Sequence, residues 1–206
     1  MKKIVNTIMK AIHILFPYSL MTTIKRINSS IYTAWIKNEF KRTGNISIKG
    51  NLNLLGGKFI VVGNKTGFGR YGVLQAWDNY KGEKFSPTIS IGDDCWIGDY
   101  FNISAIKSIT IGNRVLMGRW ITILDNSHGK TAFEDLIIPP RIRPLFSKGE
   151  VVIEDDVWIG DKVSILPGVH IGKGAVIGSN SVVTKDIPAY AVACGIPCKI
   201  IKQNGL

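Results

Sequence analysis

The sequence predicts a mainly β solenoid built from units of six residues. In the C-terminal third of the chain, an aliphatic residue stands at every sixth position: Ile153, Ile159, Ile165, Ile171, Ile177 and Val183. The fifth residue of each unit is small or β-branched: Val157, Val163, Val169, Ala175 and Ser181. An α-helix repeats near 3.6 residues and a strand near two, so neither alone gives a period of six. Stacked repeats bury a continuous core, which favours a solenoid over a β-sandwich.

An earlier block of the same unit strengthens this prediction. Units begin at Ile91 and Ile97, Ile103 keeps the phase, and after a slip of two residues the pattern restarts at Ile111, Met117 and Ile123. The second residue of several units is glycine: Gly160, Gly172 and Gly178. We expect these glycines to turn the corners of the coil, where a positive φ is needed. Imperfect early coils are expected over residues 46–75.

The repeat resembles the hexapeptide-repeat acyltransferases over residues 46–202. Its most specific stretches are residues 153–160, 165–169, 182–188 and 195–199, which are similar to the sugar O-acetyltransferase branch, including galactoside, maltose and capsular polysaccharide enzymes. The resemblance implies a left-handed parallel β-helix with acetyl-CoA as co-substrate. It also implies a homotrimer with active sites between neighbouring subunits. Low charge, at 20% of residues, is compatible with a large subunit interface.

Residues 1–45 form a separate basic segment with two expected helices. They hold eight Lys or Arg residues and one acid, Glu39, and so carry most of the net charge of +11. Apolar residues at helical spacing predict a first helix over residues 3–16, ended by Pro17. A second helical pattern follows, with an apolar stripe of Leu20, Ile24, Ile27, Ile31 and Trp35.

Two roles are open for these helices. Solenoids need caps at their open ends, so we expect both helices to pack on the first coil. Peripheral docking on an anionic membrane is the alternative, since the first helix is too short and too polar to span a bilayer. No recognised nucleic-acid module accompanies the basic charge, so we expect no nucleic-acid partner. Three cysteines without framework spacing favour a cytoplasmic location, with contact at the inner membrane face under the docking alternative.

Two segments interrupt the repeat. Residues 76–87 are expected to form a surface loop, and residues 129–150 an extruded loop. Pro139, Pro140 and Pro144 argue against a strand or a helix in the second loop. A long loop in a compact fold is usually functional, and the resemblance implies that it folds over the neighbouring subunit's site. Residues 203–206 are expected to form a short tail.

His128 is the candidate catalytic residue. It lies where the second loop departs, seventeen residues after Ile111, and the resemblance places the catalytic histidine there. A neutral imidazole can remove a proton from a sugar hydroxyl as that hydroxyl attacks the thioester. Asp125 and Asn126 could orient the ring, or could be simple turn residues. His13 is expected to be structural, and His170 is expected at a solvated corner.

The resemblance assigns the acetyl-CoA site to residues of the last coils: Trp158, Gly160, Asp161, Gly178, Ser179, Thr184 and Lys185. Lys185, Lys199 and Lys202 could meet its phosphates as point charges. No metal is expected. The zinc enzymes built on this fold need three histidine ligands, whereas the repeat holds only His128 and His170.

The residues expected to bind the acceptor sugar have aromatic and amide side chains. Galactoside enzymes use an asparagine in the coil before the catalytic histidine, and the repeat phase places Tyr100 there, with Asn102 two residues later. Trp77, Asp78, Tyr80 and Arg119 are further sugar contacts by their position in loops or corners, and aromatic faces suit sugar rings. The sequence therefore predicts an O-acetyltransferase acting on a sugar or a surface-polysaccharide precursor.

Three other functions remain open. They are N-acetyl transfer to a nucleotide-linked amino sugar, a streptogramin-type antibiotic acetyltransferase, and a non-catalytic β-helix scaffold.

Overall fold

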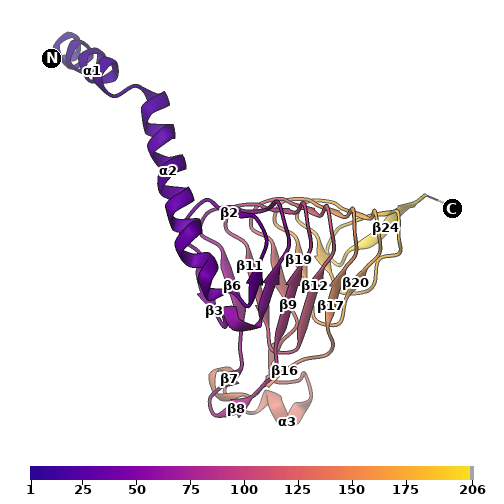
Figure 1. Ribbon diagram of the computed structural model, residues 1–206. Coiled ribbons are helices and arrows are strands. Elements are labelled where there is room, and N and C mark those ends of the chain that lie inside the picture. Colours follow the sequence, from indigo (N-terminus) through magenta and orange to yellow (C-terminus); the bar gives the residue numbers. More distant parts are fainter. Residues whose placement is uncertain (205–206) are drawn as a thin grey trace.

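The computed structural model describes residues 1–204, and most of them form a coil of three parallel sheets. In Figure 1 the coil runs from the base of α2 to the C-terminal strand. The first sheet contains β1 (Arg42–Thr43), β4 (Ile60–Val62), β9 (Thr88–Ile91), β12 (Ser108–Ile111), β17 (Val151–Ile153) and β20 (His170–Ile171). The second contains β2 (Ile46–Ile48), β5 (Thr66–Phe68), β10 (Trp96–Ile97), β13 (Leu116–Met117), β18 (Trp158–Ile159), β21 (Val176–Ile177), β23 (Ala191–Cys194) and β24 (Lys199–Gln203). The third contains β3 (Asn53–Leu55), β6 (Val73–Ala76), β11 (Asn102–Ala105), β14 (Thr122–Leu124), β19 (Ser164–Ile165) and β22 (Val182–Val183).

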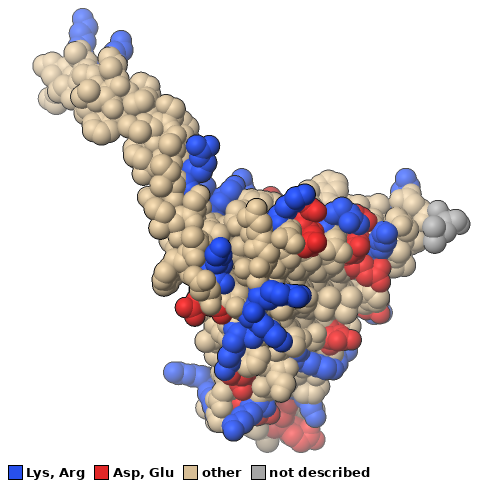
Figure 2. Space-filling view, viewed as in Figure 1, with Lys and Arg blue, Asp and Glu red and all other residues tan. Residues whose placement is uncertain are grey.

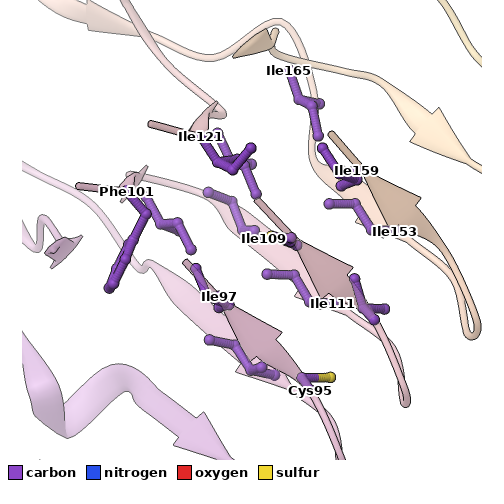
Figure 3. Packing of buried hydrophobic residues seen from close by; sticks show 14 of the residues in the cluster. Cys95, Ile97, Phe101, Ile109, Ile111, Ile121, Ile153, Ile159 and Ile165 are labelled. Atoms are coloured by element: carbon purple, nitrogen blue, oxygen red, sulfur yellow. The ribbon is translucent and has the colours of Figure 1, made fainter. Parts of the chain in front are cut away.

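The six-residue period sets which side chains stack. Equivalent residues of successive coils, three units apart, pair directly, as in Leu116 with Trp158 and Trp158 with Val176. The aliphatic first residues and the compact fifth residues are buried, among them Ile159 and Val163, both with no exposed surface. Figure 3 shows isoleucines of successive coils lying one above another. The predicted repeat and its core are therefore confirmed.

The role expected of the second-position glycines is wrong. Positive φ angles occur instead at the fourth residue of the unit, as in Asp156 (63°), Lys162 (57°) and Asn180 (58°). Glycine is required at the second position by the close approach of the next coil. A Cβ on Gly160 would lie 2.6 Å from Ser179 Oγ, and one on Gly172 would lie 2.4 Å from Ala189 N. Coil-to-coil spacing, rather than the turn itself, excludes a side chain there.

Two helices precede the coil, α1 (Lys2–Leu15) and α2 (Tyr18–Ile36), followed by the short η1 (Lys37–Glu39). The C-terminal half of α2 packs on the first coil, but through its polar side. Ser29 Oγ donates to Ile48 O at 2.6 Å, and Thr33 Oγ1 accepts from Ile48 N at 2.9 Å. Tyr32 OH likewise accepts from Leu52 N at 3.0 Å. The first coil has no preceding strand, so hydroxyl groups of α2 satisfy its backbone.

The expectation that both helices pack on the first coil therefore differs from the structure, since α2 packs there and α1 does not. The predicted stripe of α2 is solvent-exposed, with Ile31 64% and Trp35 65% exposed. All residues of α1 are exposed, and α1 projects away from the coil in Figure 1. Among the described residues, no single helix has the length and apolar character to cross a bilayer. The pair formed by α1 and residues 18–39 meets those criteria together, but it is bent by 49°.

Both interruptions leave the coil at the same corner, after strands of the third sheet. The first contains a hairpin of β7 (Asn79–Tyr80) and β8 (Glu83–Lys84). The second contains β15 (Ser127–His128), α3 (Phe133–Leu136), η3 (Pro140–Ile142) and β16 (Leu145–Phe146), so it is more ordered than the prolines suggested. The two segments touch, because Lys81 Nζ donates to Arg141 O. A further short helix, η2 (Gly57–Phe59), lies in the first coils.

The last strand, β24, closes the second sheet by pairing antiparallel with β23. It extends through Gln203, one residue into the segment expected to be a tail. Residues 205–206 of that expected tail lie outside the described part of the chain.

Candidate active site

His128 lies at the corner between the third and first sheets, which we call the third corner. Its strand, β15, pairs antiparallel with β16, so that His128 is opposite Leu145. Gly129 follows with a φ of 75°, and its N–H donates to Pro144 O at 2.8 Å. Ser127 Oγ donates to Gly129 O at 2.9 Å. The backbone around His128 is thus fixed, while the imidazole itself is exposed.

Aromatic side chains of the first interruption meet His128. The rings of Tyr80 and His128 are in an edge contact, with centroids 5.7 Å apart. Trp77 makes an edge contact with Tyr80 at 6.1 Å. Two predicted residues, Trp77 and His128, are therefore brought together through Tyr80. Lys58 Nζ forms an ion pair with Asp78 Oδ2 at 2.9 Å, and the hydrogen bond from Lys58 lowers the pKa of the Asp78 carboxyl.

The Asp125 carboxylate holds the third corner, and its hydrogen bonds go to backbone N–H groups and Asn126 rather than to the imidazole. The side chain is fully buried, and its carboxylate accepts the backbone N–H groups of Ile106 (2.9 Å), Lys107 (2.8 Å) and Ser108 (2.7 Å). Asn126 Nδ2 donates to Ser104 O at 3.0 Å. Of the two roles left open for Asp125 and Asn126, these hydrogen bonds favour the turn. They anchor the corner from which His128 projects.

A groove of about 530 Å³ runs along the second sheet and its corner with the third sheet, which we call the second corner. We call it the second-sheet groove. It is lined by Lys49, Arg70, Trp96, Gly98, Asp99, Leu116, Met117, Gly118, Arg119, Trp158, Ile159, Gly160, Asp161 and Ser179. Four residues predicted to bind acetyl-CoA, namely Trp158, Gly160, Asp161 and Ser179, thus share one concave surface. Apolar and cationic side chains together suit a ligand with a hydrophobic arm and phosphates.

Asp161 and Ser179 also have a structural role that the sequence reading missed. The Asp161 carboxylate accepts Arg119 N–H at 2.7 Å, and Ser179 Oγ accepts Asp161 N–H at 3.1 Å. The same relation links Asp99 to Arg70 N–H at 2.8 Å. Polar third residues of the unit therefore tie each coil to the preceding one. Their recurrence, as Asp, Asn or Ser after glycine, was the signal that could have revealed this ladder.

The other predicted co-substrate residues lie elsewhere. Thr184 and Lys185 follow β22 at the third corner, the same corner as His128, two strands further along the third sheet. Gly178 packs under Cys194, since a Cβ there would lie 2.8 Å from Cys194 Cβ. Lys199 and Lys202 are exposed on β24. Within one subunit, the predicted set is therefore divided between two corners and the C-terminal strand.

The predicted acceptor residues are divided as well. Tyr100 lies at the second corner, stacked between Tyr71 and Trp120 with centroids 5.1 Å from each. Asn102 begins β11, on the face between the two corners. Neither shares the aromatic cluster of Trp77, Tyr80 and His128. The resemblance-based placement of Tyr100 therefore corresponds to a different corner from that of the candidate base.

Two of the groove residues that the sequence reading missed, Trp96 and Leu116, have a common position in the repeat. Trp96 and Leu116 are sixth residues of their units, as is Trp158, and these outward-facing side chains line one wall. Lys49 lies over the Trp96 ring, 4.4 Å from its centroid. His170, expected at a corner, instead lies in β20 and hydrogen-bonds Glu154 Oε1 at 2.8 Å.

Comparison with known proteins identifies similar transferases. A family model described as "Bacterial transferase hexapeptide (six repeats)" matches residues 150–185. The chain is 42% identical over 119 residues to a "Putative lipopolysaccharide biosynthesis O-acetyl transferase" of Escherichia coli strain K12, covering 56% of this chain and 60% of that protein. It is 39% identical over 128 residues to a "Probable macrolide acetyltransferase" of Lysinibacillus sphaericus, covering 59% of this chain and 69% of that protein. The chain therefore spans less than two thirds of the first of these relatives and slightly more than two thirds of the second.

Among solved structures, an N-acyltransferase from Bacillus cereus, in complex with dTDP and 3-hydroxybutyryl-CoA, has a TM-score of 0.67. The two chains are 19% identical, and the match covers 82% of this chain and 86% of that one. At this identity the likeness concerns the fold alone. Together with the three parallel sheets, it fits the left-handed β-helix.

Proposed function

The chain belongs to the hexapeptide-repeat transferase family, and from that premise we propose that it transfers an acetyl group from acetyl-CoA to a hydroxyl group of a saccharide. The observation that carries the proposal is the exposed imidazole of His128, which projects from the third corner and contacts Tyr80, itself in contact with Trp77. An accessible base next to aromatic rings suits a sugar hydroxyl, because sugar rings pack on aromatic faces. A sugar or surface-polysaccharide precursor is the proposed acceptor, and the lipopolysaccharide relative supports that choice.

The proposed reaction is a direct transfer. His128 removes the proton of the acceptor hydroxyl as its oxygen attacks the acetyl carbonyl carbon. The C–O bond forms, the thioester C–S bond breaks, and the imidazolium returns the proton to the departing thiolate, which leaves as CoA. No covalent acyl-enzyme is needed, so the free cysteines Cys95, Cys194 and Cys198 have no part in it.

We propose that a homotrimer completes the site. The second-sheet groove and His128 belong to different corners of one subunit, and His128 does not line that groove. A neighbouring copy that presents its third corner to this groove would bring the two halves together. Trp158 would then pack on the pantetheine arm of acetyl-CoA, and Lys185, Lys199 and Lys202 would meet the phosphates.

The test is CoA release measured with a thiol reagent, using acetyl-CoA and a panel of saccharides, with wild type beside His128→Ala. We expect acceptor-dependent release that falls by about 10²- to 10⁴-fold in the variant. The oligomeric mass and the acetyl-CoA affinity should stay unchanged, which separates loss of the base from loss of structure. Near-wild-type turnover by His128→Ala would exclude His128 as the base.

A second acceptor class is favoured by one relative. The Lysinibacillus protein is named as a probable macrolide acetyltransferase. This chain covers 69% of that protein, compared with 60% of the lipopolysaccharide relative. The panel should therefore include macrolides and streptogramins, together with nucleotide-linked amino sugars for N-acetyl transfer. Turnover of one of these, with none on saccharides, would keep the acetyltransferase and replace the acceptor.

A further inference from the structure

We propose that α1 binds the surface of an anionic lipid bilayer. Most of its apolar residues gather on one side of the helix, because they recur at spacings of three and four, whereas Ile14 falls on the side of Lys3 and Lys10. We call this side the α1 apolar face: Ile4, Val5, Ile8, Met9, Ile12 and Leu15. Each of these side chains is exposed, from 44% at Ile12 to 70% at Leu15. Nothing else in residues 1–204 covers this face, so water meets it in the isolated subunit.

Charge identifies the occupant of the α1 apolar face. Lys3 and Lys10 lie on the opposite side of α1, Lys2 lies at the edge of the apolar face beside Met9, and no Asp or Glu precedes Glu39 in the chain. An apolar face backed by lysines is the pattern of helices that lie in a membrane interface and attract anionic headgroups. A second copy of α1 would bring more lysines and no acid to pair with them. Charge therefore favours lipid over self-association.

The shape of the N-terminal segment allows this contact. Fourteen residues of helix are about 21 Å long, short of the roughly 30 Å hydrocarbon core, so α1 would lie in the interface rather than cross it. Figures 1 and 2 show α1 at the far end of α2, away from the coil, with lysines at its tip. The apolar stripe of α2 is exposed as well. A bilayer could therefore receive α1 without contacting the β-helix.

Co-sedimentation of the full chain with lipid vesicles tests this proposal. Vesicles of phosphatidylcholine alone are compared with vesicles of phosphatidylcholine and phosphatidylglycerol. We expect wild type to bind the anionic vesicles more tightly, and less so as salt is raised. Ile8→Glu should weaken that binding at least tenfold, since it replaces an exposed isoleucine that the bilayer would bury with a charged side chain. Lys3→Gln should weaken it about fivefold, whereas Asn6→Gln, on the polar side, should leave it unchanged.

Three results would overturn the proposal. They are absence of wild-type binding to anionic vesicles, equal binding to both vesicle types, and anionic binding that Ile8→Glu leaves intact. Oligomeric mass is measured for each protein by light scattering. If Ile8→Glu changes that mass and wild type ignores vesicles, a second copy covers the face instead. The β-helix core lies apart from α1, so its thermal unfolding should be the same in all variants and exclude misfolding as the cause.

Discussion

The imidazole of His128 meets the phenol ring of Tyr80 edge-on, with ring centroids 5.7 Å apart and ring planes at 64°. The two residues come from different interruptions of the repeat, which lie together at the third corner. Backbone hydrogen bonds fix the chain on either side of His128, and Tyr80 contacts the ring itself. We therefore predict that Tyr80 positions the proposed base.

Tyr80→Ala should lower kcat by about tenfold or more, because a misplaced base transfers protons inefficiently. The affinity for acetyl-CoA should stay the same, since Tyr80 lies outside the second-sheet groove. Steady-state CoA release with the best acceptor from the panel gives kcat and KM for each variant. Tyr80→Phe is the matched control, because it keeps the ring and removes only the hydroxyl. If the phenylalanine variant is as slow as the alanine variant, the hydroxyl rather than the ring matters.

Asp125→Asn should destabilise the fold by about 1–3 kcal/mol, the cost of leaving a buried donor or acceptor without its partner. The carboxylate accepts three backbone N–H groups, whereas an amide would turn its own N–H₂ toward at least one of them. Urea unfolding followed by circular dichroism measures the change. Asp78→Asn is the control, since Asp78 is an exposed partner of Lys58 and should matter far less. An unchanged midpoint for Asp125→Asn would show that the corner does not depend on this carboxylate.

Trp158→Ala should weaken acetyl-CoA binding by roughly fivefold, the value of one aromatic packing contact, with little effect on folding. The side chain is 55% exposed and forms a wall of the second-sheet groove, so its loss leaves no core cavity. Isothermal titration with acetyl-CoA measures the affinity. Trp35→Ala removes another exposed tryptophan, on α2, and should leave the affinity unchanged. Equal weakening by both variants would argue against a specific role for Trp158.

The core could be predicted from the sequence because every coil repeats the same burial pattern. Ile159 and Val163 are buried for the same reason as Ile177 and Ser181, because they are the first and fifth residues of their units. The six-residue period of the sequence therefore predicts their burial directly. Gly160 was interpreted wrongly because its constraint comes from Ser179 in the next coil, and the spacing of two coils is not visible in one unit. The repeat pattern predicts the burial of residues within one unit, but it does not predict the steric contacts between neighbouring coils.

The orientation of α2 could not be predicted for a related reason. Its apolar stripe is the obvious packing surface, but the first coil presents backbone groups of Ile48 and Leu52 that need hydrogen-bond partners. Hydroxyl groups of Ser29, Tyr32 and Thr33 supply them, which turns the stripe outward. His128 could be found by resemblance, whereas its contact with Tyr80 depends on two long segments meeting in space.

The carboxyl of Glu154 gives the fold an acid-dependent contact. Its pKa lies below the ordinary 4.5, first because Lys173 N–H donates to it and second because the His170 ring does so. A depressed pKa means that the unfolded chain takes up the proton more readily. The stabilisation is therefore present above the unfolded pKa and is lost as pH falls through the folded pKa.

Glu154→Gln should accordingly be less stable than wild type at neutral pH, and the difference should shrink as pH falls below about 4.5. The urea midpoints of both proteins, measured at successive pH values, test this. Glu150→Gln, which changes an exposed carboxylate of the same segment, serves as the control. A difference between wild type and Glu154→Gln that stays constant with pH would mean that the glutamine loses shape or packing rather than charge. In that case the Lys173 and His170 contacts would contribute independently of ionisation.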